Sequence, residues 1–181
     1  MAKIKGIGLV NLRTIFRKRP PAEEKLLLSR LTEEEQKIYL TTITTGWTPV
    51  EIQNNIYVQA AEILFPLEQA KCIVLGKAVA EISYTTVYRT FLRIMVPEAV
   101  AQRWVKIWKL HHDSGLPSYE MKNNRHLVLT VRGYPGLPSA TRQLITGHVI
   151  KIVELVGIKS FTVNHMEDNP ESWRWEVLWE K

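Results

Sequence analysis

The sequence is poor in the residues that build covalent or metal-based scaffolds, since its 181 residues include a single cysteine, Cys72. One cysteine forms no intramolecular disulfide and supplies no thiolate-rich metal site. It lies in the apolar run Cys72–Leu75, which predicts a buried, unreactive thiol. No run approaches the ~20 apolar residues of a membrane-spanning helix, and the first residues lack the apolar core of a signal peptide. The sequence therefore predicts a cytoplasmic protein without a membrane span.

Motifs for nucleotide binding and nucleophilic catalysis are also missing. Gly6 and Gly8 lack the third glycine of a dinucleotide fingerprint, and Gly76–Ala78 has neither the first glycine nor the hydroxyl of a P-loop. There is no serine in a Gly-x-Ser-x-Gly elbow. These absences argue against an enzyme, and no catalytic residue is assigned.

Metal ligands and paired carboxylates are sparse. His111, His112 and Asp113 form the one dense cluster, but adjacent helical residues point about 100° apart and do not easily share an ion. Glu167 and Asp168 precede Asn-Pro, which favours a turn over acid–base chemistry. No metal site is predicted, and an enzyme using His111, His112 or Glu167 is the weakest hypothesis.

The positive charge is what the chain has in excess, with 24 basic against 18 acidic residues. Basic residues crowd 13–19 and recur at Arg103, Lys106 and Lys109. Such stripes can meet phosphates. Glutamates follow the first cluster closely, however, and no nucleic-acid motif accompanies either one. Nucleic-acid association through these basic faces is therefore kept as the alternative function, while nucleic acid is not the expected partner.

Apolar residues recur at helical spacing over the first two-thirds of the chain. Lys3–Val10 predicts a short strand, and helices are predicted over 11–18, over 22–30, from Thr32, from Thr48, over 67–95 with a bend near Gly76, and from Pro97. Thr32 with Glu35, and Thr48 with Glu51, have the spacing of capping boxes. Pro97 at the first helical position supports the helix that is predicted to start there.

The last third predicts a sheet crossed by one long helix. Residues 139–156 have a single apolar face, and Gly157 follows where a helix C-cap favours a left-handed residue. Residues 126–132, 160–164 and 173–179 alternate as half-buried strands, and 118–122 fits a fourth. The predicted fold class is α+β, with a helix-rich N-terminal two-thirds packed on a C-terminal antiparallel sheet of three to four strands and one long crossing helix. We expect a single domain over 1–181, with residues 1–45 as a helical extension left open.

Six tryptophans are many for this length. Trp173, Trp175 and Trp179 share one strand face, and Trp104 and Trp108 share a helix face with His111. This pattern favours an aromatic core between helices and sheet. Aromatic groups also line small-molecule pockets, and the two interpretations are compatible.

Several short motifs in a fixed order resemble a known group of proteins. They are Trp47-Thr-Pro, Leu75-Gly-Lys-Ala, Val87-Tyr88-Arg89-Thr-Phe, Thr146-Gly147-His148 and the ending Glu154-Leu-Val-Gly with its strand. The order resembles an uncharacterised bacterial family of myxobacterial type, related in fold to the superfamily of haem-nitric-oxide-binding, vinyl-reductase-type and TRAPP-subunit proteins. The haem branch carries a Tyr-x-Ser-x-Arg motif, which Tyr84–Arg89 does not reproduce, and the cysteine cluster of some vinyl-reductase-type domains is absent. The resemblance therefore names no cofactor.

The resemblance implies a non-catalytic sensory or scaffolding module that binds a small apolar ligand, a partner protein, or both. Related folds often pair, so self-association as a homodimer is left open. The residues expected to bind a ligand are Tyr88, Arg89, Trp104, Trp108, His111 and His148. Arg89 is the candidate for an anionic group on that ligand, with a salt bridge on the helix surface as the competing role.

Overall fold

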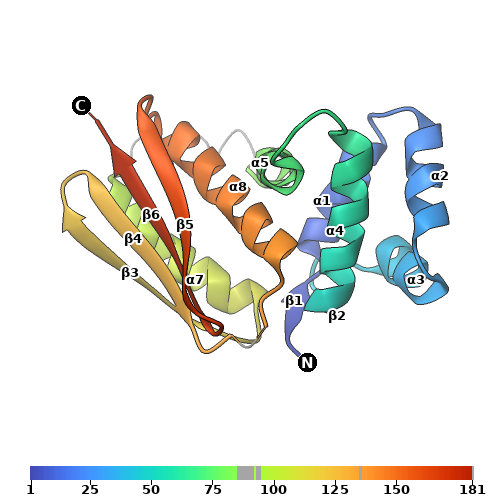
Figure 1. Cartoon of the computed structure of the whole chain (residues 1–181), viewed down its shortest axis with the longest axis horizontal. Helices are drawn as coiled ribbons and strands as arrows, with labels where there is room; N and C mark the ends of the chain where they lie inside the picture. Colours follow the sequence, from blue (N-terminus) through green and yellow to red (C-terminus); the bar gives the residue numbers. More distant parts are fainter. Residues whose placement is uncertain (85–91, 93–94, 135, 181) are drawn as a thin grey trace. The chain divides into compact units, whose positions relative to one another are not determined.

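The computed structural model describes residues 1–84, 92, 95–134 and 136–180, and the chain forms two compact units. The first unit contains Lys3–Ser83 and Pro138–His148, and the second contains Tyr84–Leu137 and Val149–Lys181. Helices dominate the first unit and an antiparallel sheet dominates the second (Figure 1), which confirms the α+β prediction. The prediction of a single domain stays a prediction. None of the helices among the described residues is long and apolar enough to cross a membrane.

The first unit packs short helices around one apolar core. Its elements are α1 (Ile7–Phe16), α2 (Pro21–Arg30), α3 (Glu33–Thr41), α4 (Val50–Leu64), α5 (Lys71–Ser83) and the first half of α8 (Ser139–Val156). Helix α4 contacts α2, α3 and α5 (Figure 1), and its buried residues include Ile56, Ala60 and Leu64. The core also takes Leu9, Leu12 and Phe16 from α1 and Leu75 and Val79 from α5.

Two short strands close one side of this unit. Strand β1 (Lys3–Lys5) pairs antiparallel with β2 (Trp47–Pro49), so that Ile4 lies opposite Thr48. Beneath them Gln53 is completely buried, and its amide donates to the Ile4 and Lys5 carbonyls and to the Thr48 hydroxyl. The Tyr57 hydroxyl donates to Gln53 Oε1 at 2.7 Å. A buried polar network therefore holds the strand pair on α4.

The capping box predicted at Thr32 is confirmed, because Thr32 Oγ1 accepts from the Glu35 N–H and the Glu35 carboxylate accepts from the Thr32 N–H. The box predicted at Thr48 is wrong. Thr48 lies in β2, where its hydroxyl bonds to the Ile4 carbonyl, and α4 begins only at Val50, after Pro49. The predicted strand over Lys3–Val10 is also too long, because α1 already begins at Ile7.

The second unit is built on a four-stranded antiparallel sheet with the strand order β3-β4-β6-β5. The strands are β3 (Leu116–Asn123), β4 (His126–Arg132), β5 (Phe161–Asn169) and β6 (Ser172–Trp179). Leu127 pairs with Val177 and Leu129 with Trp175 across β4 and β6. The turn predicted at Glu167 is wrong, since Glu167 lies in β5 opposite Trp173, next to an irregularity in the register.

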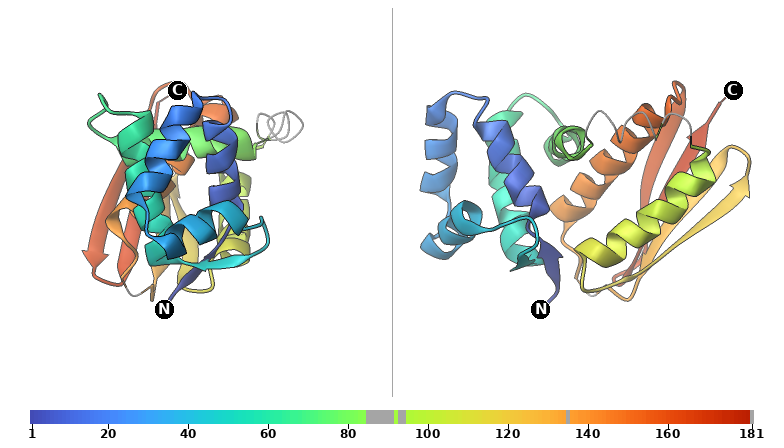
Figure 2. Two further views of the ribbon diagram at one scale, coloured as in Figure 1. Left: turned by 90° about the vertical axis from the view of Figure 1, so that its right-hand side faces the viewer. Right: turned by 180° about the vertical axis from the view of Figure 1, so that it is seen from behind.

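Helix α7 (Pro97–His111) and the second half of α8 cover the apolar face of this sheet. Helix α7 contacts β3 and β4, and the right-hand view of Figure 2 shows it lying along the sheet. Trp173, Trp175 and Val177 are buried, and Trp179 is half-buried. The predicted tryptophan-bearing face of the last strand is therefore a core face.

Candidate functional site

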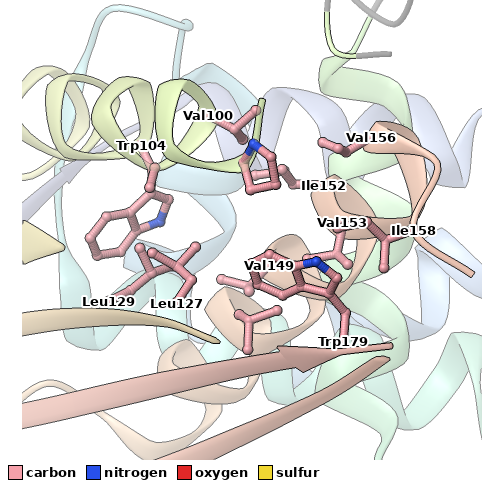
Figure 3. Close-up of a pocket in the computed structure, with 13 residues that line it drawn as sticks. Val100, Trp104, Leu127, Leu129, Val149, Ile152, Val153, Val156, Ile158 and Trp179 are labelled. Atoms are coloured by element: carbon pink, nitrogen blue, oxygen red, sulfur yellow. The ribbon is translucent and has the colours of Figure 1, made fainter. Parts of the chain in front are cut away.

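The candidate site is an apolar pocket inside the second unit, between α7, α8 and the sheet (Figure 3). Helix α7 supplies Pro97, Val100, Ala101 and Trp104, because Pro97 starts the helix and the apolar residues then recur on one face. Helix α8 and the turn after it supply Val149, Ile152, Val153, Val156 and Ile158. The sheet supplies Leu127, Leu129, Val177 and Trp179.

The ending of α8 brings its last pocket residue into place. Gly157 has φ +94, a left-handed conformation that ends the helix and that residues with a Cβ rarely adopt. Ile158 follows directly and lines the pocket together with Val156. Figure 3 shows Trp104 beside Leu127 and Leu129 on one side, and Trp179 near Val153 and Ile158 on the other.

Burial divides the pocket into a floor and a mouth. Trp104, Val153 and Val177 are among the buried floor residues. Val100, Ile152 and Trp179 are only half-buried and mark the side toward solvent.

The pocket lining is almost pure hydrocarbon. The thirteen side chains that line it among the described residues carry no charge, hydroxyl or amide, and their only heteroatoms are the indole nitrogens of Trp104 and Trp179. The cavity volume is about 40 Å³. A water molecule needs roughly 10–15 Å³ and two to four polar partners, while an engineered cavity of about 150 Å³ binds benzene. The space therefore suits an apolar group of a few heavy atoms better than water.

This pocket does not fit a haem. Haem iron takes an axial histidine, cysteine, methionine or tyrosine, and none of these is among the pocket residues that the structure describes. The volume is also far below that of a porphyrin ring. In the part of the chain that the structure describes, no three His, Cys, Asp or Glu side chains are grouped so as to hold a metal ion.

An aromatic cluster lies next to the pocket in the same unit. Trp108 stands 5.5 Å from Trp104 and stacks flat on His112, with ring centroids 3.8 Å apart and an interplanar angle of 6°. The buried Tyr134 meets both Trp108 and His112 edge-on. The Trp108 indole N–H donates to the Ser114 carbonyl at 3.1 Å. These contacts fix the C-terminal end of α7 and leave no space for a ligand between Trp108 and His112.

The predicted site residues are only partly brought together. Trp104 lines the pocket, and Trp108 contacts Trp104 from the aromatic cluster. His111 is half-buried at the end of α7, and its neighbour His112 makes the ring stack. His148 lies in the part of α8 that belongs to the first unit. Tyr88 and Arg89 lie outside the described residues.

The aliphatic pocket residues were not named as ligand-binding residues from the sequence. Val149, Val153 and Val156 were recognised only as the apolar face of a helix. The periodicity that marks a buried face is the same whether neighbouring side chains fill the space or leave a cavity. The sequence feature that could have indicated a pocket is the presence of three apolar faces, on α7, on α8 and on the strand pair β4–β6, which converge here.

The two groups of basic residues considered for nucleic-acid binding differ in their contacts. The Arg13 guanidinium donates to the Tyr39 and Thr42 carbonyls at the end of α3, and Arg19 pairs with Glu23 at 2.9 Å. Part of the first cluster thus stabilises the first unit. Arg103, Lys106 and Lys109 are exposed on α7.

Comparison with known proteins identifies the fold. No protein-family model matches the sequence, and no curated protein matches it. Solved structures of H-NOX proteins do match over nearly the whole chain. An Fe(II) unliganded H-NOX protein mutant from K. algicida has a TM-score of 0.67 at 13% identity and covers 98% of this chain and 97% of that one.

Two further matches agree with the first. The H-NOX protein from S. oneidensis in the Fe(II)NO state has a TM-score of 0.66 at 13% identity, covering 98% of this chain and 100% of that one. A solution structure of the H-NOX protein from Shewanella woodyi in the Fe(II)CO state has a TM-score of 0.66 at 12% identity, covering 97% of this chain and 94% of that one. The expected relation to the haem-nitric-oxide-binding fold is confirmed, while membership of the myxobacterial-type family stays a prediction. The chain has an H-NOX-like fold.

Proposed function

We propose that this chain is a non-catalytic sensory or scaffolding module that takes a small apolar ligand into the pocket of its second unit. The observation that carries the proposal is the hydrocarbon lining of a cavity of about 40 Å³. Such a cavity binds through the hydrophobic effect and shape, with no polar group to orient a reacting substrate. Binding without chemistry is what a sensor requires.

The similar solved structures support the ligand class. Two of the H-NOX structures are described in NO-bound and CO-bound states. Both ligands are small and nearly apolar. The pocket of this chain offers space for a molecule of that size, and its described residues include no iron ligand, so the side chains themselves would provide the binding surface.

Binding is tested by methyl NMR spectra of the protein in buffer saturated with cyclopropane, a probe of three carbon atoms. We expect the methyl signals of Val149, Ile152 and Val153 to shift in a saturable way, because these groups line the cavity. Signals from first-unit methyls such as Leu12 and Leu27 should stay in place.

A matched pair of variants checks the site of binding. Ala101 is 1% exposed and lines the pocket, so Ala101→Val places two more carbons against the cavity and should weaken the shifts. Ala140→Val makes the same change at a residue that is 8% exposed and does not line the pocket. The proposal fails if cyclopropane leaves the pocket methyls unmoved, or if both variants alter the shifts equally.

Native mass spectrometry and an absorbance spectrum of the purified protein test the same proposal without added ligand. A retained small apolar molecule would support it. A haem absorbance band with a matching mass would contradict it, because no described residue of the pocket can serve as an axial ligand.

The nucleic-acid alternative has a separate test. Binding through Arg103, Lys106 and Lys109 would fall steeply with salt in a mobility-shift assay, since phosphate contacts release counterions. Alanine substitution of all three should then abolish the shift. Binding that survives the triple substitution would remove this α7 face from consideration.

A further inference from the structure

The sheet of the second unit ends in two edge strands that differ in how they are protected. In the strand order β3-β4-β6-β5 the outermost strands are β3 and β5, and Figure 1 shows them at the two margins of the sheet. An edge strand can pair with another chain, and proteins usually prevent this with proline, lysine or other charged side chains on that strand. The presence or absence of such protection decides which edge can accept a further strand.

Strand β5 directs backbone donors and acceptors away from the sheet. The Trp179 N–H donates to the Arg125 carbonyl beside β4, so Trp179 bonds toward β4 rather than β5. Phe161 lies opposite Trp179, and bonding direction alternates along a strand, so Phe161 and Val163 direct their N–H and C=O groups away from β6. Within the described part of the chain, no hydrogen bond reaches these groups from the open side of β5. They are available to an added strand.

Strand β3 is protected where β5 is not. Pro117 lies opposite Val131, and Val131 bonds toward β6 by the same alternation, so Pro117 faces the outer side of β3 and has no N–H to offer there. Strand β3 also exposes the charged Glu120 and Lys122. By contrast, residues 161–166 of β5 include no proline, lysine, arginine, aspartate or glutamate. The β5 edge is therefore the one that can accept a strand.

We propose that β5 pairs antiparallel with β5 of a second copy of this chain, with Val163 on the two-fold axis. This register places Val163 opposite its own counterpart and Phe161 opposite His165, so that an apolar pair is flanked by an aromatic pair on each side. A two-fold contact brings the centre of a strand against itself, where like charges would repel. Residues 160–166 carry no carboxylate, ammonium or guanidinium group, and the strand is thus compatible with itself.

The pairing also accounts for the apolar margin of the sheet. Phe161 and Val163 are only half-buried, and Val163 lies opposite the buried Val177 on the core face. A second β5 extends that face and covers their exposed parts. Both outer margins of the joined sheet are then β3 strands, where Pro117 opposes further growth, so the assembly closes as a dimer. One strand pair is a small interface, and the dimer is therefore reversible.

Sedimentation velocity of the full chain over a wide range of concentrations tests the pairing. We expect the mass to rise from 20.9 kDa toward twice that value as the concentration increases. Val163→Lys places two ammonium groups face to face and should weaken association about tenfold or more. Tyr119→Lys is the matched control, because Tyr119 is also half-buried and faces outward, but from β3. It should leave association unchanged, and circular dichroism checks that both variants fold.

Disulfide cross-linking tests the register with milder changes, in a Cys72→Ser background that removes the native thiol. Across the two-fold axis the Cα atoms of residue 163 would lie about 5.5 Å apart, within the range that a disulfide spans. Val163→Cys should therefore cross-link on mild oxidation. Thr162→Cys should not, because residue 162 would lie opposite Asn164 and about 7–8 Å from its own counterpart.

Four results would overturn the proposal. A chain that stays monomeric at every concentration has no such contact. Association that survives Val163→Lys, or that Tyr119→Lys weakens equally, lies outside the β5 edge. Equal cross-linking of Val163→Cys and Thr162→Cys would show random collision or another register.

Discussion

Gly76 and Gly147 face each other where α5 crosses α8 in the first unit. A Cβ built on Gly147 would lie 2.9 Å from the Gly76 Cα, and one on Gly76 would collide with the Leu144 carbonyl. Two short motifs that are 71 residues apart in the sequence are therefore one contact in the structure. Glycine is required at both positions because the two helix backbones touch.

Substitution at this crossing should destabilise the protein despite the higher helix propensity of alanine. Gly147→Ala gains up to about 1 kcal/mol of propensity but forces the helices apart, which costs roughly 1–3 kcal/mol. We expect a net loss of stability in urea unfolding. Gln143→Ala, on the exposed side of α8, is the control and should change stability by less than about 0.5 kcal/mol. A stabilised Gly147→Ala protein would contradict the close crossing.

The capping box of α3 should make stability depend on pH. Burial raises the pKa of Glu35, but hydrogen bonds from the Thr32 N–H and the Asn55 amide outweigh it and hold this pKa below 4.5. The carboxylate therefore stabilises the fold above pH 4.5, and this contribution is lost as the pH falls through the lowered folded-state pKa. Urea unfolding of the wild type and Glu35→Gln at pH 6 and at pH 3 measures it. The gap between the two proteins should narrow at the lower pH, and a constant gap would contradict the box.

The buried network under β1 and β2 should be costly to open. Gln53→Leu removes the amide that donates to the Ile4 and Lys5 carbonyls and the oxygen that accepts from the Tyr57 hydroxyl, and leaving buried polar groups unsatisfied costs about 1–3 kcal/mol. Tyr57→Phe should cost less, because it removes one donor and retains the amide. Urea unfolding gives both values. Equal stability of Gln53→Leu and the wild type would show that the network does not hold the strand pair.

The two faces of β6 should respond very differently to truncation. Trp175 is 0% exposed between α7 and the sheet, so Trp175→Ala should cost about 3–5 kcal/mol. Leu178 lies on the opposite face and is 38% exposed, so Leu178→Ala should cost less than about 1 kcal/mol. Thermal unfolding of both variants measures the two losses of stability. Similar losses would show that the sheet does not bury its tryptophan face.

The sequence predicted those elements whose signal is local. Alternation along Trp173–Trp179 predicted both the strand and its buried face, and Gly157 marked the end of α8 correctly. The capping box predicted at Thr48 was wrong because the spacing of Thr48 and Glu51 is a local signal. In the structure the Thr48 hydroxyl bonds instead to the Ile4 carbonyl of β1, 44 residues away in the sequence. The extent of β5 was missed because Glu167 precedes turn residues, yet pairs with Trp173.

The candidate site was less accessible from the sequence than the fold. Aromatic residues and histidines were named because they carry distinctive chemistry, and among those that the structure describes only Trp104 lines the pocket. The stacking of His112 on Trp108 was not predicted, because it arises where α7 ends at His111 and the backbone of His112 becomes extended. A cavity is a property of three packed surfaces, and no single stretch of sequence encodes it.

The central claim is that the second unit holds a dry apolar cavity that admits a small ligand, and xenon tests it most directly. Xenon binds apolar cavities of this kind and gives strong anomalous scattering in a pressurised crystal. The account predicts a xenon peak enclosed by Trp104, Val153 and Val177, reduced in Ala101→Val. An empty cavity under pressure, or side chains collapsed into that space, would contradict it.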